Sequence, residues 1–205
     1  MGRALVGMTV LVATALEQAT AALLGPDLRL AESVIAADDA VDAEQRELDA
    51  RVMDLIARQQ PVAGDLRTLV TSLRMSADLE RMGDLARHIA KIARLRFPDC
   101  AVPEELRESV ASMGRLGVEL AGKVGQIIDD RDVDAARALE GEDDAVDRLH
   151  RALFSALLSY EHPYTIEAAI DVTLIGRYYE RFADHAVSVA TRLIFLITGE
   201  DVRIG

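Results

Sequence analysis

The sequence predicts an all-α protein made of two tandem three-helix bundles related by an internal duplication. Half of its 205 residues are hydrophobic but only 4% are aromatic, and abundant Ala, Leu, Arg and Glu favour helices. We find none of the short runs of alternating apolar and polar residues that are typical of strands. The string DDAVD and the motif Glu-Arg-x-x-Asp each occur twice, in the same order. Repetition of this kind indicates duplication of one supersecondary unit.

Glycine and proline mark the helix ends of the first predicted bundle. Gly25-Pro26 ends the first helix, and Asp27 stands where it can cap the second. The second helix breaks before Pro61, which is well placed to open a third because proline is tolerated in the first turn. The sequence therefore predicts three consecutive helices in the first half of the chain.

The second predicted bundle follows a linker at residues 97–103, so we expect repeats at 1–98 and 101–205. The charged string at 129–132 separates its first helix from the next, and His-Pro at 162–163 separates that one from the last. Six helices in two sets of three is the resulting prediction.

The first helix has a competing interpretation. Arg3 precedes thirteen uncharged residues, and the string ATA at 13–15 resembles the cleavage site of a secretory signal. Apolar residues nevertheless recur at intervals of three and four past that site, which favours an amphipathic helix in the core. No other stretch approaches the roughly 20 apolar residues needed to span a bilayer. The recurring residues are Leu5, Met8, Val12, Leu16, Ala19 and Leu23.

Charge and cysteine content exclude several classes of function. The net charge is −12, with 35 acidic against 23 basic residues, whereas nucleic-acid binding depends on clustered Lys and Arg. We therefore expect no nucleic-acid partner. The single Cys100 excludes an intramolecular disulfide and a thiolate metal cage, and it suits a reducing compartment. A cytoplasmic location is expected.

Each repeat carries two pairs of carboxylates, one pair on each of two successive helices. The helical spacing sets them in register with apolar residues rather than opposite to them. On the third helix, for example, a face predicted to be buried includes Leu66 and Val70 and steps on to Glu80. The eight residues are Asp38, Asp42, Glu80 and Asp84 in the first repeat, and Asp143, Asp147, Glu180 and Asp184 in the second.

Carboxylates on the apolar side of a helix need compensation. Like charges at i and i+4 repel, and removing an unpaired carboxylate from water costs on the order of several kcal/mol. Four carboxylates from two neighbouring helices form an oxygen-rich site for a divalent or trivalent cation, or for a small cluster of cations. Mg, Mn, Ca or Fe suits these ligands best, and Zn or Ni remains open. The sequence therefore predicts one metal site in each repeat.

Three alternatives compete with or qualify the metal sites. Arg81 and Arg181 are placed to neutralise carboxylates on neighbouring helices, which would give buried ion pairs without metal. A pure scaffold predicts that alanine at Glu80 or Asp184 stabilises the fold by relieving repulsion. A di-metal enzyme of ferritin-like type calls for two Glu-x-x-His motifs, whereas this chain offers only Asp147-x-x-His150. We interpret His150 as a packing residue or a residue beside the ligands.

Several longer strings resemble the PhoU family of bacterial phosphate-transport regulatory proteins. They are RQQPVAGDLR at 58–67, SADLERMGD at 76–84, YYERFADHA at 178–186 and ITGE at 197–200. The resemblance covers essentially the whole chain. It implies two pseudo-symmetric three-helix bundles with multinuclear metal clusters on the acidic motifs, so that the eight carboxylates form one site in each repeat. His88 and Ser188 depart from the asparagine that relatives often carry there.

The resemblance also implies a function. PhoU-like proteins are not enzymes. They act at the cytoplasmic face of the membrane, where they couple the phosphate ABC transporter, through its ATPase, to the phosphate-sensing histidine kinase. They hold the phosphate-starvation response off when phosphate is plentiful. By this resemblance we expect a regulator that is peripheral to the membrane through its partners, and that forms a homodimer.

Overall fold

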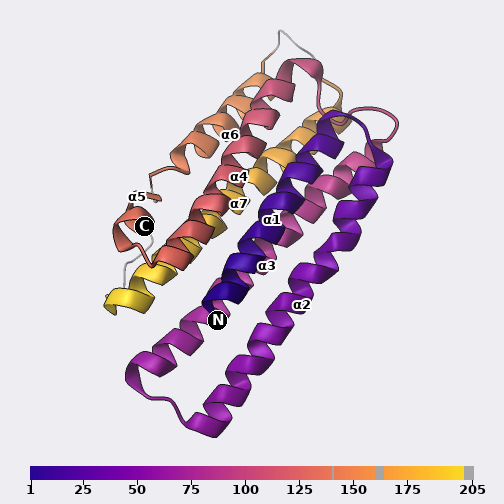
Figure 1. Ribbon diagram of the computed structural model, residues 1–205. Helices are drawn as coiled ribbons and strands as arrows, with labels where there is room; N and C mark the ends of the chain where they lie inside the picture. The colour runs from indigo at the N-terminus through magenta and orange to yellow at the C-terminus, as the bar shows by residue number, and fades with distance from the viewer. Residues whose placement is uncertain (140, 160–163, 201–205) are drawn as a thin grey trace.

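The computed structural model describes residues 1–139, 141–159 and 164–200, and in these residues the protein is helical without strands (Figure 1). This confirms the predicted all-α class. Seven α-helices and one short 3-10 helix, η1, make up the described part of the chain. Their bounds are α1 Gly2–Leu24, α2 Leu28–Gln59, α3 Ala63–Arg96, η1 Glu104–Leu106, α4 Arg107–Asp130, α5 Val133–Leu139, α6 Asp144–Leu157 and α7 Ile166–Thr198.

The first bundle consists of α1, α2 and α3, with ends close to the predicted ones. The Asp27 side chain accepts a hydrogen bond of 3.0 Å from the backbone N–H of Leu30, as its capping position predicts. The third helix begins at Ala63 rather than at Pro61. The chain turns first through Gln60, which adopts a left-handed conformation with φ 45° and ends α2.

The second bundle differs from the prediction in one respect: its middle helix is split into α5 and α6. Asp132 starts α5 by accepting hydrogen bonds from the backbone N–H groups of Asp134 and Ala135. The chain then turns at 141–143 before α6 begins. Gly141 is a poor helix former, and Asp143 and Asp144 favour the start of a helix over its interior. These two features account for the break.

The two bundles pack side by side through their inner helices. α1 lies against α4 and α3 lies against α7, while α2 flanks α1 and α3 on one side and α6 flanks α4 and α7 on the other (Figure 1). Tyr179 and Phe182 of α7 and Met82 of α3 are almost completely buried in the common core. The tandem arrangement thus gives one continuous hydrophobic core.

Ion pairs fix how α3 meets α7. Arg96 Nε lies 2.5 Å from Asp171 Oδ2, and Asp78 contacts both His185, at 3.1 Å, and Arg192, at 2.5 Å. Because the end of α3 meets the beginning of α7, the two helices run antiparallel. Asp78 and Asp171 are both buried, and each has a cationic partner that offsets the cost of removing its charge from bulk water.

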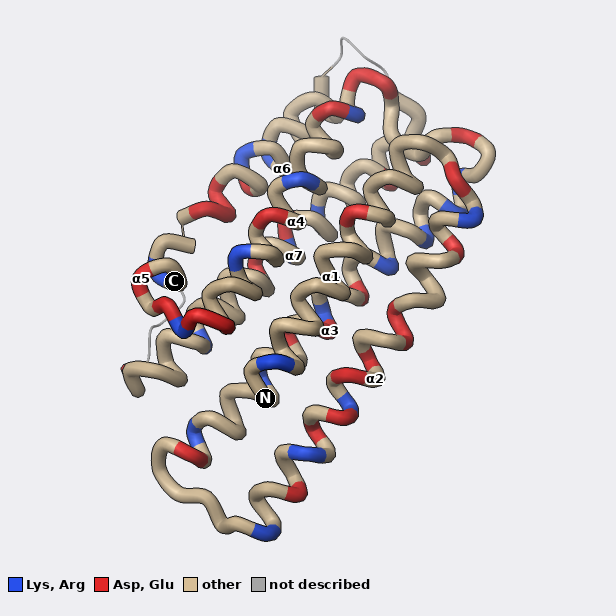
Figure 2. Tube along the Cα trace, viewed as in Figure 1, with Lys and Arg blue, Asp and Glu red and all other residues tan. Residues whose placement is uncertain are grey.

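α1 is a continuous helix whose predicted apolar face is buried. Leu5, Met8, Val12 and Leu16 are each at most 2% exposed, and the helix passes Ala15 without interruption. Figure 2 shows how few charged residues α1 carries compared with α2. By length and composition α1 is also the one helix in the described residues that could cross a membrane, a property that a buried core helix shares.

The prediction that one face at the start of α3 is buried is wrong in part. Leu66 and Val70 are 40% and 37% exposed. The reason is visible in Figure 1, where the α2–α3 hairpin extends past the N-terminal end of α1, so α1 does not cover these residues. Ile166 and Ile170, one hundred residues later, are 81% and 54% exposed. Each repeat therefore presents apolar side chains at the beginning of its last helix.

Glycine allows α1 and α4 to approach closely, which gives a test of the packing. A Cβ on Gly114 would lie 2.7 Å from Thr20 Oγ1, and Thr20 is held by a 2.7 Å hydrogen bond with the Tyr179 hydroxyl. We expect Gly114→Ala to lower the free energy of unfolding by about 1–3 kcal/mol. Gly122→Ala, on the same helix but facing open space, should be neutral or stabilise by up to about 1 kcal/mol. Denaturant unfolding checks both, and equal effects would contradict the packing.

Candidate metal centres

The first acidic cluster lies at the seam between α2 and α3. Val34 and Val41 lie on the face of α2 that packs into the core, and Asp38 lies on the same face with only 6% of its surface exposed. Gly83 of α3 makes room for it, because a Cβ there would lie 3.3 Å from Asp38 Oδ1. Asp42, Glu80 and Asp84 are half-buried at the same seam. The four predicted residues of the first repeat therefore come from the two expected helices.

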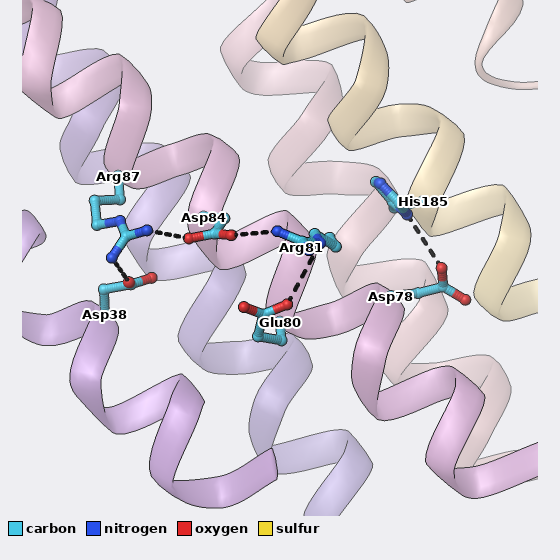
Figure 3. A network of polar contacts seen from close by, with 7 residues as sticks. All are labelled: Asp38, Asp78, Glu80, Arg81, Asp84, Arg87 and His185. Atoms are coloured by element: carbon cyan, nitrogen blue, oxygen red, sulfur yellow. Dashed lines mark hydrogen bonds and ion pairs between the residues drawn. The ribbon is translucent and has the colours of Figure 1, made fainter. Parts of the chain in front are cut away.

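Arginines occupy part of this cluster (Figure 3). Arg87 Nη1 lies 2.7 Å from Asp38 Oδ2, and Arg87 Nη2 contacts Asp84 Oδ1. Arg81 donates a 2.9 Å hydrogen bond to the other oxygen of Asp84 and lies 3.8 Å from Glu80. The contact between Arg87 and Asp38 is close but poorly directed, since Asp38 Oδ2 has no hydrogen-bond partner among the residues that the structure describes. Charge, rather than a directed hydrogen bond, holds this pair.

Two carboxylates of the first cluster, Asp38 and Glu80, have a raised pKa. Burial raises the pKa of Asp38, and Asp84 and Asp42 raise it further, against the lowering effect of Arg87. Burial also raises the pKa of Glu80, with Asp84 adding to the effect and Arg81 opposing it. The arginines therefore compensate only part of the negative charge, and the site retains an attraction for a further cation.

The second acidic cluster lies between α6 and α7. Asp143 immediately precedes α6, Asp147 follows one turn later, and both are half-buried. Across the seam, Glu180 is half-buried and contacts Arg177 through both carboxylate oxygens. Asp184 is exposed at the edge of the cluster. The second repeat thus places its four predicted residues as the first does, with one of them open to solvent.

Two carboxylates of the second cluster, Asp143 and Asp184, also have a raised pKa. Burial raises the pKa of Asp143, followed by repulsion from Asp147. Although Asp184 is exposed, nearby protein atoms displace part of its hydration and raise its pKa, and Glu180 raises it further. Arg177 opposes this shift. The mutual repulsion shows that the four carboxylates interact across the seam.

The ligand chemistry fits a hard cation, but the side chains are not arranged as a finished site. In the described ranges, no three Asp, Glu, His or Cys side chains are placed so that they could already hold a metal ion. The groups available are oxygen ligands of net negative charge, which suit Mg, Mn or Fe. They include a buried oxygen of Asp38 without a hydrogen bond. Metal binding would therefore require the carboxylates to close around the ion.

The sequence interpretation missed Arg87. It proposed Arg81 and Arg181 as partners for a neighbouring helix, but Arg81 contacts carboxylates of its own helix and Arg181 is exposed. The interhelical pair is made by Arg87, three residues beyond Asp84. The steps of four and three from Glu80 to Asp84 to Arg87 place all three on one face, a signal that the sequence already contained.

The two histidines near the clusters pack against other residues. His150 is half-buried beside Gly176, where a Cβ would lie 3.0 Å from its ring, and it meets Phe154 edge-on with ring centroids 4.9 Å apart. Burial lowers the pKa of His150, and Arg177 lowers it further. His88 stacks on Tyr178 at 5.3 Å. Both rings thus lie next to the carboxylates as part of the packing.

The fold and the sites together define a class: all-α proteins of two packed three-helix bundles with an acidic cluster at equivalent seams of each. A family model described as the PhoU domain matches residues 5–93 and 110–193. The chain belongs to the PhoU family, as its motifs indicated.

Relatives of known name and structure resemble the chain over most of its length. It is 48% identical to a Mycobacterium tuberculosis protein named phosphate-specific transport system accessory protein PhoU homolog 2, over 92% of this chain and 89% of that one. The crystal structure of PhoU from Pseudomonas aeruginosa matches with a TM-score of 0.86 at 28% identity, covering 97% and 95% of the two chains. The crystal structure of the phosphate transport system regulatory protein PhoU from Streptococcus pneumoniae matches with a TM-score of 0.87 at 27% identity. The match covers 98% of this chain and 95% of that one.

The raised pKa values predict how stability depends on pH when metal is removed. Because the folded-state pKa of Asp143 and Asp184 exceeds the ordinary 3.8, their contribution to stability is fully present below that value. It is lost as the pH rises through the raised folded-state pKa. In a chelator, the Tm of the natural protein should therefore rise, relative to that of Asp143→Asn/Asp184→Asn, as the pH falls from about 7 towards about 4. A Tm difference that does not change with pH would contradict this prediction.

Proposed function

We propose that this protein is a metal-binding regulator of phosphate uptake and of phosphate-starvation signalling. It couples the phosphate ABC transporter to a sensor histidine kinase and represses the response when phosphate is plentiful. The observation that carries this proposal is the match over most of the chain to a protein named as an accessory of phosphate-specific transport, at 48% identity. The crystal structure from Streptococcus pneumoniae, with the same fold, is named as a regulatory protein of phosphate transport.

In this proposal each acidic cluster binds one divalent or trivalent cation or a small cluster of them, with Fe, Zn, Mn, Mg and Ni as candidates. Asp38, Asp42, Glu80 and Asp84 would hold the first. Asp143, Asp147, Glu180 and Asp184 would hold the second. The raised pKa values and the buried, unbonded oxygen of Asp38 support it, since a cation would relieve both the repulsion and the desolvation. The ions would stabilise the seams, and the function includes no catalytic step.

The proposed partners are the ATPase of the phosphate transporter and the phosphate-sensing kinase, met at the cytoplasmic side of the membrane. The exposed apolar residues just after α6 and at the beginning of α7 are consistent with a protein that binds others, since apolar surface of this kind often marks an interaction site. Leu158, Ile166 and Ile170 are each more than half exposed. We further propose that the protein forms a homodimer, which light scattering would test.

Metal content tests the site half of the proposal. Protein purified without added metal should contain bound metal by elemental analysis, and a chelator should lower its Tm because binding energy contributes to folding. The Glu180→Gln/Asp184→Asn variant should lose metal that the natural protein retains. Ser188→Ala, one turn beyond Asp184 on the same helix, is a matched control that should keep it. If the purified protein contains no metal and its Tm is unchanged by a chelator, metal binding is contradicted.

Capture of the host's phosphate-transport ATPase tests the partner half. The purified chain should retain the ATPase in a pull-down, and Ile170→Asp should weaken capture several-fold because it places a charge on exposed apolar surface. Val10→Asp, at a position of α1 that is 60% exposed, provides a matched control that should capture normally. Failure of the natural chain to retain the ATPase would contradict the proposed coupling.

A further inference from the structure

The two acidic clusters differ in where their arginine lies. In the first repeat Arg87 stands three residues after Asp84, and the equivalent position of the second repeat is Val187, which is buried. In the second repeat Arg177 stands three residues before Glu180, and the equivalent position of the first is Ala77. Apart from Arg81 and Arg181, which occupy equivalent positions, each repeat therefore has one further arginine at its cluster, and this arginine is not at the same position in the two repeats.

In the first cluster the guanidinium occupies the position of a bridging cation. It joins Asp38 of α2 to Asp84 of α3, the same two helices that a metal ion would join (Figure 3). The Asp38 side chain is only 5% exposed and that of Arg87 only 29% exposed, so solvent screens the pair weakly. Arginine remains charged at any physiological pH. A metal ion that uses both carboxylates must displace this group or be repelled by it.

In the second cluster the arginine lies at the edge. Arg177 contacts Glu180 alone among the proposed ligands, and its side chain is 53% exposed. Within the part of the chain that the structure describes, no Lys or Arg lies at ion-pair distance from Asp143, Asp147 or Asp184. Here the space between the helices contains carboxylates without a resident cation. The two sites are thus chemically different despite their common origin.

We propose that Arg87 acts as a built-in cation in the first cluster, so that a metal ion enters the second cluster readily and the first only when Arg87 withdraws. This inference rests on the proposed metal binding. It makes Arg87 a specificity-determining residue for that function, because its position decides which repeat takes metal. The chain then responds to metal with one repeat, while the other is stabilised by its own side chain.

The direct test measures Mn²⁺ binding by calorimetry at the first cluster alone, in a Glu180→Gln/Asp184→Asn background. In this background Mn²⁺ should bind weakly, and Arg87→Gln should raise its affinity by about tenfold or more because a fixed positive charge is removed. Asp38→Asn should abolish the gain. Arg74→Gln removes an exposed arginine from the same helix and controls for the change in net charge, so it should raise the affinity far less.

Thermal unfolding in a chelator supplies a readout that does not involve metal. Arg87→Gln should lower the Tm because it leaves the buried Asp38 carboxylate without its cation. Adding Asp38→Asn should recover most of the loss, and Mn²⁺ should raise the Tm of Arg87→Gln more than that of the natural protein. A Tm unchanged by Arg87→Gln would overturn the inference.

The remaining outcomes separate this inference from the proposed function. Equal Mn²⁺ affinity at both clusters of the natural protein would overturn the role of Arg87 and leave metal binding intact. No Mn²⁺ binding in any variant, including the natural protein, would overturn metal binding and with it the inequality of the two clusters. If Arg74→Gln raises the Mn²⁺ affinity as much as Arg87→Gln does, then net charge, and not the bridging guanidinium, controls binding.

Discussion

An ionised carboxylate held between packed helices requires a positive charge nearby, and this constraint governs both halves of the molecule. Asp38 is nearly buried on the core side of α2, where an unpaired charge costs on the order of several kcal/mol. The neighbouring acids raise that cost further. In the first repeat a guanidinium satisfies part of the requirement, whereas in the second the carboxylates repel one another with one arginine at their edge. The proposed metal sites follow from this deficit.

The same requirement explains how the bundles are joined. Asp78 and Asp171 are buried where α3 meets α7, and each has an arginine from the opposite helix. These pairs fix the antiparallel arrangement of the two inner helices. They also hold the two acidic seams in a fixed relation, because α3 and α7 each contribute one wall of a seam. The fold thereby connects two sites that lie on separate helix pairs.

Much of this structure could be predicted from local sequence. Proline, glycine and Asp27 mark helix ends through backbone chemistry, and the duplicated acids identify the seams because helical periodicity fixes which residues share a face. The break between α5 and α6 was missed because the apolar period continues across it. Leu66 and Val70 were predicted to be buried because periodicity does not reveal that α1 ends short of them. The pairing of Arg87 with Asp38 depends on how α2 and α3 are rotated against each other, which only the tertiary structure shows.

We propose that cations hold the acidic seams together. The most direct measurement is anomalous X-ray diffraction from crystals grown with Mn²⁺, which places each bound ion among its ligands. The account predicts a strong peak between α6 and α7 within bonding distance of Asp143, Asp147, Glu180 and Asp184, and a weaker peak or none beside Arg87. Seam carboxylates that turn out into solvent, with no peak near either cluster, would contradict it.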